Sequence, residues 1–84
     1  MYQVHISAKA KKQLSKIEVI ARHKIARKID ALIANPRPKD VKKLSTSDDF
    51  YRIREGDYRI IYSIQDQLLI VLVIKIGHRR DIYR

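Results

Sequence analysis

The sequence predicts an α+β domain in which two amino-terminal helices pack on a small, mainly antiparallel sheet, in the chain order β-α-α-β-β-β. Three observations support this class. Apolar residues recur at a helical period before residue 35, and the period changes to 2 after residue 50. At 84 residues the chain has room for one core, and no linker or repeat divides it, so we expect residues 1–84 to form a single domain.

The first half holds a short strand and two helices. Residues 2–6 alternate apolar and polar side chains, which is typical of a strand with one buried face. Ser7 is a favourable helix N-cap, and the apolar stripe after it predicts a helix over residues 8–17. A second helical pattern covers residues 19–34 and ends before Pro36, because proline cannot continue a helix. The junction between the two helices contains neither glycine nor proline.

Three strands follow in a meander. Residues 51–55 and 58–65 alternate in character and are joined by a tight turn at Gly56. Residues 68–76 are apolar on both faces, which is typical of a central strand, and we expect Gly77 to end it. A polar loop over residues 45–49 separates the meander from the helices.

The composition is strongly basic. Nineteen Lys and Arg residues against nine Asp and Glu residues give a net charge of +10 at pH 7. A surplus of that size on a small body raises the local concentration of polyanions, which favours nucleic acid or an acidic protein as a partner. The alternative is a basic surface that serves solubility alone.

The same composition argues against metal sites and membrane spans. Because there is no Cys and the three His residues are scattered, we expect no disulfide, no structural metal and no bound cofactor. The longest apolar run has seven residues, which is too short to cross a membrane. The amino terminus has no apolar signal region, so we expect a cytoplasmic protein.

The two kinds of cation are segregated along the chain. Nine of the ten Lys residues lie within residues 1–49, and six of the nine Arg residues lie within residues 52–84. Lysine is a flexible, strongly hydrated point charge, whereas arginine is a planar fork that matches phosphate oxygens. This distribution predicts a phosphate-binding site in the second half and a steering field in the first half.

Three arginines are expected to share one face of the sheet. The period of 2 places Arg52 and Arg54 opposite the core contact Ile53, on the face without helices. If the tight turn pairs the two strands, Arg59 lies near both. Three adjacent guanidinium groups repel one another, and a bound polyanion would remove that cost. The alternative is that the three cations spread into water.

The carboxy-terminal stretch supplies further candidates. His78 lies among arginines, and we expect these cations to favour the neutral imidazole, which can accept a proton. The alternative is an ordinary surface His. Tyr83 offers a stacking ring or a phenolic proton, and we expect Lys75 and Arg80, with Arg52 and Arg54, to contact a nucleic-acid backbone.

Two stretches of the chain resemble the RelE family of toxins from bacterial and archaeal toxin–antitoxin systems: residues 51–62 (YRIREGDYRIIY) and residues 76–83 (IGHRRDIY). The resemblance covers nearly the whole chain. It implies a small antiparallel sheet on two amino-terminal helices, and a metal-independent endoribonuclease that enters the A site of the 30S ribosomal subunit and cuts the messenger RNA. It also implies a cognate antitoxin that neutralises the toxin.

The resemblance assigns roles to individual positions. The basic pair of the family falls on Arg52 and Arg54, its transition-state arginine on Arg59, its arginine after the glycine on Arg79, and its terminal tyrosine on Tyr83. The implied reaction is attack of a ribose 2′-hydroxyl on the adjacent phosphate, which leaves a 2′,3′-cyclic phosphate and a free 5′-hydroxyl. It needs a base, cations on the phosphoryl oxygens and an acid.

The chain departs from the best-known member of the family, which has Lys at both positions of the basic pair. Arginine stays protonated and can bind or orient a phosphate but cannot exchange protons, so Arg52 and Arg54 are expected to be phosphate clamps. We expect His78 to be the base, with Tyr83 assisting, because regular alternation points Glu55 to the other face. The shorter tail between the arginine after the glycine and the terminal tyrosine can displace the ring.

Two other functions remain open on the same fold. One is a ParE-like inhibitor of DNA gyrase, which acts by binding. The other is a catalytically inactive module that binds RNA or its antitoxin, because the arginine pair cannot transfer protons.

Overall fold

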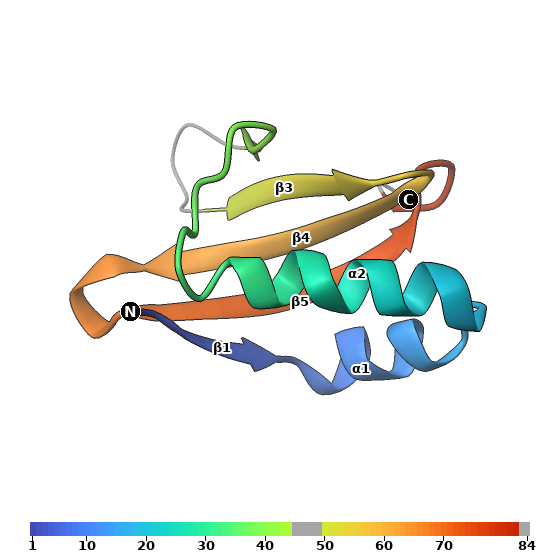
Figure 1. Ribbon diagram of the computed structural model, residues 1–84, viewed down its shortest axis with the longest axis horizontal. Helices are drawn as coiled ribbons and strands as arrows, with labels where there is room; N and C mark the ends of the chain where they lie inside the picture. The colour runs from blue at the N-terminus through green and yellow to red at the C-terminus, as the bar shows by residue number, and fades with distance from the viewer. Residues whose placement is uncertain (45–49, 83–84) are drawn as a thin grey trace.

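A computed structural model describes residues 1–44 and 50–82, so the loop predicted over residues 45–49 lies outside the described residues. Figure 1 shows the helices packed against a twisted sheet. The elements are β1 (Gln3–Ile6), α1 (Ala8–Ser15), α2 (Val19–Ala31), β2 (Lys42–Lys43), β3 (Phe50–Glu55), β4 (Tyr58–Gln65), the 3₁₀ turn η1 (Asp66–Leu68) and β5 (Ile70–His78). The predicted α+β class, with two amino-terminal helices on a mainly antiparallel sheet, is confirmed.

The sheet has five strands in the order β1-β5-β4-β3-β2. β1 pairs with β5 in parallel, and the other pairs are antiparallel. As predicted, the last strand is central, because it lies between β1 and β4. Both helices cover the same face of the sheet (Figure 1), where Ile25 and Ile29 of α2 join strand residues in one buried core.

Several boundaries differ from the prediction, and α1 ends at Ser15 instead of residue 17. α2 ends at Ala31, three residues before the end expected at residue 34. The last strand covers residues 70–78 instead of 68–76, because η1 and a left-handed Leu69 (φ 54°) turn the chain first. Gly77 therefore lies inside β5 and does not end it. The two-residue β2 was not predicted, since both of its lysines are exposed and carry no apolar pattern.

Side-chain caps explain where each helix begins. The Ser7 hydroxyl accepts a hydrogen bond from the Ala10 amide at 3.1 Å, as predicted for an N-cap. The Glu18 carboxylate accepts from the amides of Ala21 (2.7 Å) and Ile20 (3.0 Å), and these bonds lower the pKa of Glu18. A new N-cap therefore separates the two helices, and no glycine or proline is needed.

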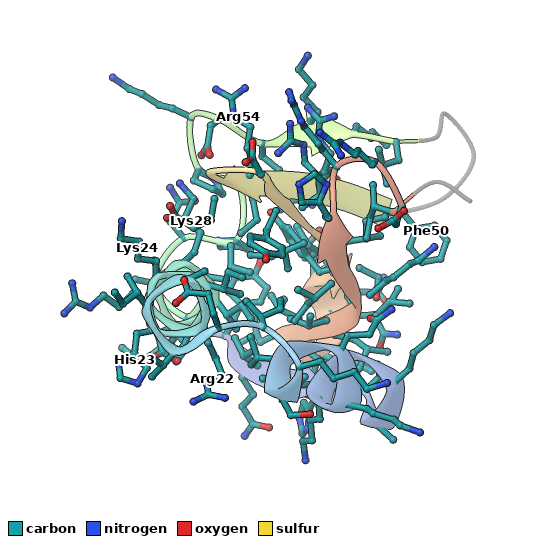
Figure 2. The ribbon with its side chains drawn as sticks, turned by 90° about the vertical axis from the view of Figure 1, so that its right-hand side faces the viewer. Arg22, His23, Lys24, Lys28, Phe50 and Arg54 are labelled. Carbon is teal, nitrogen blue, oxygen red and sulfur yellow. The ribbon has the colours of Figure 1, made fainter. Side chains whose placement is uncertain are left out.

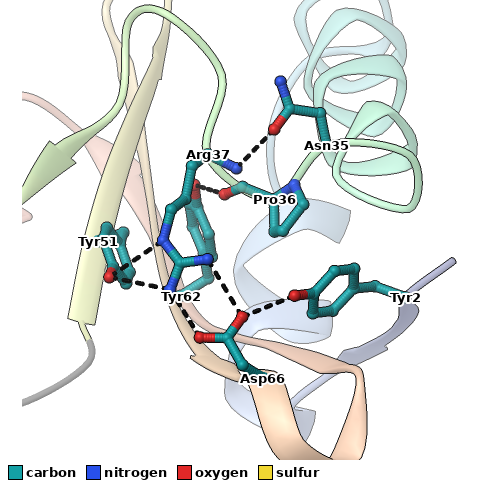
Figure 3. Close-up of polar contacts among 7 residues, drawn as sticks. All are labelled: Tyr2, Asn35, Pro36, Arg37, Tyr51, Tyr62 and Asp66. Atoms are coloured by element: carbon teal, nitrogen blue, oxygen red, sulfur yellow. Dashed lines mark hydrogen bonds and ion pairs between the residues drawn. The ribbon is translucent and has the colours of Figure 1, made fainter.

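A polar network ties the loop after α2 to the far end of the sheet (Figure 3). Arg37 donates two hydrogen bonds to the Asp66 carboxylate, at 3.1 and 2.8 Å, and its guanidinium lies 5.2 Å from the centre of the Tyr51 ring. Tyr2 of the amino-terminal segment donates to the same carboxylate at 2.6 Å. The hydrogen bonds from Arg37 and then Tyr2 lower the pKa of Asp66 to about 2.

This network predicts a stability term that depends on pH. The pKa of Asp66 is lower in the folded state than the value of about 3.9 expected when unfolded, so its stabilisation is complete above the unfolded pKa. It is lost as the pH falls through the folded pKa of about 2. Urea unfolding of the wild type and Asp66→Asn should give a constant difference above about pH 5 that shrinks below about pH 4. A difference that stays unchanged down to pH 2 would contradict this assignment.

Candidate functional site

Cross-strand register brings three predicted arginines onto one face of the sheet. Tyr51 and Ile53 of β3 are buried under the helices, so the alternating Arg52 and Arg54 lie on the helix-free side. Arg54 is directly opposite Arg59 of β4, and Arg52 is opposite Ile61. Opposed side chains start about 4.5–5.5 Å apart at Cβ. We call this group of Arg52, Arg54 and Arg59 the arginine face.

The hairpin between β3 and β4 fixes the guanidinium of Arg59. Its Nη1 donates to the carbonyl oxygens of Gly56 and Tyr58, each at 3.1 Å. Gly56 has φ 58°, a left-handed conformation that allows the chain to reverse within two residues. Arg59 is half-buried on the sheet, whereas Arg54 is exposed. The arginine face thus combines one anchored guanidinium with one that is open to solvent.

Arg54 also lies at the edge of the sheet, beside Asp40. Lys28 of α2 lies 3.0 Å from the Asp40 carboxylate, and Figure 2 shows Lys28 and Arg54 on this side of the molecule. The hydrogen bond from Lys28, with a smaller contribution from the charge of Arg54, lowers the pKa of Asp40. The negative charge of Asp40 therefore partly neutralises the positive charge at the sheet edge next to Arg54. The arginine face keeps its net positive charge.

The same hairpin also holds Arg79, through Asp57. The Arg79 amide donates to the Asp57 carbonyl oxygen at 2.8 Å, and its Nε lies 3.7 Å from the Asp57 carboxylate. Lys75 of β5 is opposite Ile61, on the face that carries the arginines. The side chain of Arg80 is exposed. The structure therefore places Lys75 on the helix-free side of the sheet and holds Arg79 at the β3–β4 hairpin.

His78 lies on the other side of the sheet. It is opposite Tyr58, whose ring packs against the core, and the two rings meet edge to face with centres 5.8 Å apart. The His78 Nδ1 accepts a hydrogen bond from the Arg80 amide at 3.1 Å. In the neutral ring that bond assigns the proton to Nε2. His78 thus offers a ligand a donor, at the end of the sheet and not among the three arginines.

Glu55 also lies on the helix-covered side of the sheet, and for Glu55 the alternation of β3 predicted this position. Glu55 and Tyr58 line a cavity of about 160 Å³ between the start of α2 and the β3–β4 hairpin. Tyr83, the other residue expected in proton transfer, lies outside the described residues. The arginines and the described proton-transfer candidates therefore occupy opposite faces at the same end of the sheet.

Gly77 allows the carboxy-terminal turn to fold back onto the arginine face. It is opposite Arg59 in the ladder, and a Cβ placed there would lie 3.1 Å from the Cδ1 of Ile82. The amides of Asp81 and Ile82 donate to the His78 carbonyl oxygen at 2.8 and 3.0 Å, and Ile82 is buried. The sequence suggested a strand terminator at Gly77, but the structure shows close packing that no periodic pattern signals.

Two kinds of site are not found in the described part of the chain. Among residues 1–44 and 50–82, no three His, Asp or Glu side chains come together in a group that could hold a metal ion. Neither of the helices in these ranges is long and apolar enough to cross a membrane.

Comparison with known proteins identifies the family. Residues 4–83 match the family model described as ParE toxin of the type II toxin–antitoxin system parDE. The protein named toxin RelE1 from Methanocaldococcus jannaschii is 31% identical, and the match covers 99% of this chain and 96% of that protein. The chain belongs to the RelE family of type II toxins.

Other RelE relatives support the same assignment. The mRNA interferase toxin RelE of Escherichia coli strain K12 is 29% identical over 93% of this chain and 83% of its own length. The toxin fold of the archaeal RelE–RelB complex from Pyrococcus horikoshii superposes with a TM-score of 0.85 at 33% identity, and covers 95% of this chain and 97% of that one. The resemblance seen in the sequence is therefore confirmed.

In this RelE-family toxin, sequence reasoning found the arginines but not the groups that hold them. The Asp57 contact with Arg79 joins a turn to a strand end that is distant in sequence, and nothing in the local pattern indicates it. His78 lies on the side of the sheet opposite the arginine face because it pairs with Tyr58. The sequence does not predict this position. Apolar and polar residues do not alternate in β5, so its pattern does not show which residues face the helices.

Close packing at Gly77 predicts a coupled stability effect. In Gly77→Val the new side chain occupies the space of the Ile82 side chain, so the free energy of unfolding should fall by about 1–3 kcal/mol. The same substitution in an Ile82→Ala background should cost less, because the clash is gone. A cost that is equal in both backgrounds, measured by urea unfolding, would show that Ile82 does not determine the need for glycine.

Proposed function

We propose that this RelE-family toxin is a ribosome-dependent endoribonuclease that cleaves messenger RNA in the A site and so inhibits translation. The arginine face carries this proposal, above all the opposition of Arg54 and Arg59 on a rigid pair of strands. Like charges on directly opposed positions of two strands are destabilising, and a phosphodiester bound at this face would provide the compensating charge. The E. coli relative named an mRNA interferase supports the same class of activity.

The proposed reaction is an internal transesterification. The 2′-oxygen loses its proton and bonds to the adjacent phosphorus, the bond from phosphorus to the 5′-oxygen breaks, and that oxygen takes up a proton. The products are a 2′,3′-cyclic phosphate and a 5′-hydroxyl, and no water is consumed. Negative charge builds on the phosphoryl oxygens in the transition state, where preorganised cations are most effective.

The arginines have different roles in this reaction, which follow from how each guanidinium is held. Arg59 is fixed by two carbonyl oxygens of the hairpin, so it is preorganised to meet the charge that develops on the phosphoryl oxygens. Arg52 and Arg54 remain protonated and serve as clamps on the messenger backbone. Arg79, held by Asp57 at the same hairpin, extends the positive surface toward the end of the sheet.

Proton transfer is assigned to His78 and Tyr83. The neutral His78 ring can accept a proton only at the nitrogen that carries no hydrogen, which is the Nδ1 engaged by the Arg80 amide. To act as the base at the 2′-oxygen, His78 would have to release that amide. In this assignment His78 takes the proton of the 2′-oxygen at the end of the sheet, and Tyr83 supplies the proton that the leaving 5′-oxygen takes up.

The proposed partners are the ribosome, its messenger and a cognate antitoxin. The P. horikoshii relative forms a RelE–RelB complex, and we infer an equivalent partner here. An acidic, partly disordered antitoxin segment complements a chain of net charge +10, and by covering the arginine face it would exclude RNA. Action on the ribosome places the toxin in the cytoplasm, without a membrane or metal requirement.

The family model that matches residues 4–83 is named for ParE, which favours gyrase inhibition as a second candidate. A gyrase supercoiling assay without ribosomes separates the two. Inhibited supercoiling together with an intact messenger would support the second candidate. Tight, salt-sensitive RNA binding with no cleavage would instead indicate a binding module whose arginine pair cannot support chemistry.

The nuclease proposal predicts that Arg59→Ala slows messenger cleavage by about 10²–10³-fold, because the transition state loses a preorganised cation. Primer extension on programmed ribosomes measures the rate, and thermal unfolding checks the fold. Arg27→Ala, on the exposed side of α2, removes the same charge from the other face and should cleave at nearly the wild-type rate. Equal losses in the two variants would contradict a specific role for Arg59.

A further inference from the structure

β5 contains a bulge where it pairs with β4. Tyr62 is opposite Val73, and Ile61 is opposite Lys75, so Ile74 is an extra residue with no opposite partner in the ladder. An insertion of one residue reverses the two faces of a strand, because side chains alternate with period 2. The bulge therefore decides which side chains of the second half of β5 reach each face.

The effect of the reversal is visible in burial. Val73, before the bulge, and Ile76, after it, are both buried in the core under the helices, although three positions separate them. Lys75 and Gly77 consequently fall on the helix-free side, opposite Ile61 and Arg59. Without the bulge, Lys75 would point into the core.

Two side chains near the start of the chain bind the backbone at the bulge. The Ser7 hydroxyl donates to the Ile74 carbonyl oxygen at 3.0 Å. The Gln13 Oε1 accepts from the Ile76 amide at 2.8 Å, across 63 positions of sequence. Gln13 is half-buried on α1, which packs on β5, so it meets this amide from the helix layer. A bulge disturbs the ladder locally, and these bonds satisfy groups beside the disturbance.

We propose that Gln13 is a positioning residue for the arginine face. By accepting the Ile76 amide it fixes the bulge, and thereby the register that places Lys75 opposite Ile61 and Gly77 opposite Arg59, on the side of the sheet that carries the arginine face. The ligand class is the phosphate backbone of RNA, which Lys75 contacts from this register. That last step rests on the proposed function, whereas the control of register does not.

Hydrogen exchange tests the control of register directly. Gln13→Leu keeps the size of the side chain but removes the acceptor, and Gln13→Glu keeps an acceptor. Loss of one net hydrogen bond of about 1 kcal/mol corresponds to exchange about fivefold faster at the Ile76 amide. The Val71 amide, in β5 before the bulge, is the internal control and should change much less. Gln13→Glu should restore the protection of Ile76.

RNA binding tests whether Gln13 controls the phosphate contact of Lys75 beside the arginine face. In the wild type, Lys75→Gln should reduce the slope of log affinity against log salt by about 0.7, the value for one phosphate contact on a single strand. In Gln13→Leu the slope should already be lower, and Lys75→Gln should have no further effect. Lys11→Gln, on the exposed side of α1, is the matched control and should have the same effect in both backgrounds.

The outcomes separate the two proposals. Undiminished Ile76 protection in Gln13→Leu, or an unchanged Lys75→Gln effect in that background, overturns the positioning role. Equal acceleration at Ile76 and Val71 also overturns it, because that indicates a general loss of stability. If Gln13→Leu does not fold, Gln13→Asn, which shortens the reach of the amide, takes its place. If the exchange and binding results are as expected but the wild type cleaves no messenger, that outcome supports the positioning role of Gln13 and contradicts the proposed nuclease function.

Discussion

The two-residue turn at Gly56 and Asp57 sets the pairing of β3 with β4, and that pairing puts Arg54 opposite Arg59. The same turn supplies one of the two carbonyl oxygens that hold Arg59, and both groups that hold Arg79. A shift of one residue in this hairpin would send the arginines toward the helices and the buried isoleucines into water. The apolar core and the charged face therefore depend on one register.

The sheet also separates two kinds of positive charge. Most lysines of the helical half are exposed on the outer surface of the helix layer, and Figure 2 shows Lys24 extending from α2 away from the core. Flexible, hydrated charges of this kind attract polyanions without fixed geometry. The arginines on the opposite face project from rigid strands and can hold one phosphate in place. Steering and positioning are thus assigned to different layers of the molecule.

Local pattern predicted most of the fold and the arginine half of the site. Period 2 in residues 51–65 was sufficient to place Arg52, Arg54 and Arg59 together, because a short turn leaves one register that buries Ile53. It could not place His78, because the extra residue at Ile74 reverses the parity of β5 and is stabilised by α1 side chains distant in sequence. Contacts of that range leave no local signal. Tyr83 remains a prediction, since it lies outside the described residues.

The central claim is that the arginine face binds the messenger backbone. Nitrogen–proton spectra of the arginine Nε groups, recorded while a messenger fragment with 2′-O-methyl riboses is added, test it directly because this fragment cannot be cleaved. The account predicts that the signals of Arg52, Arg54 and Arg59 shift together along one binding curve that weakens with salt. Shifts confined to Arg22 and Arg27 on α2, with the arginine face unchanged, would contradict it.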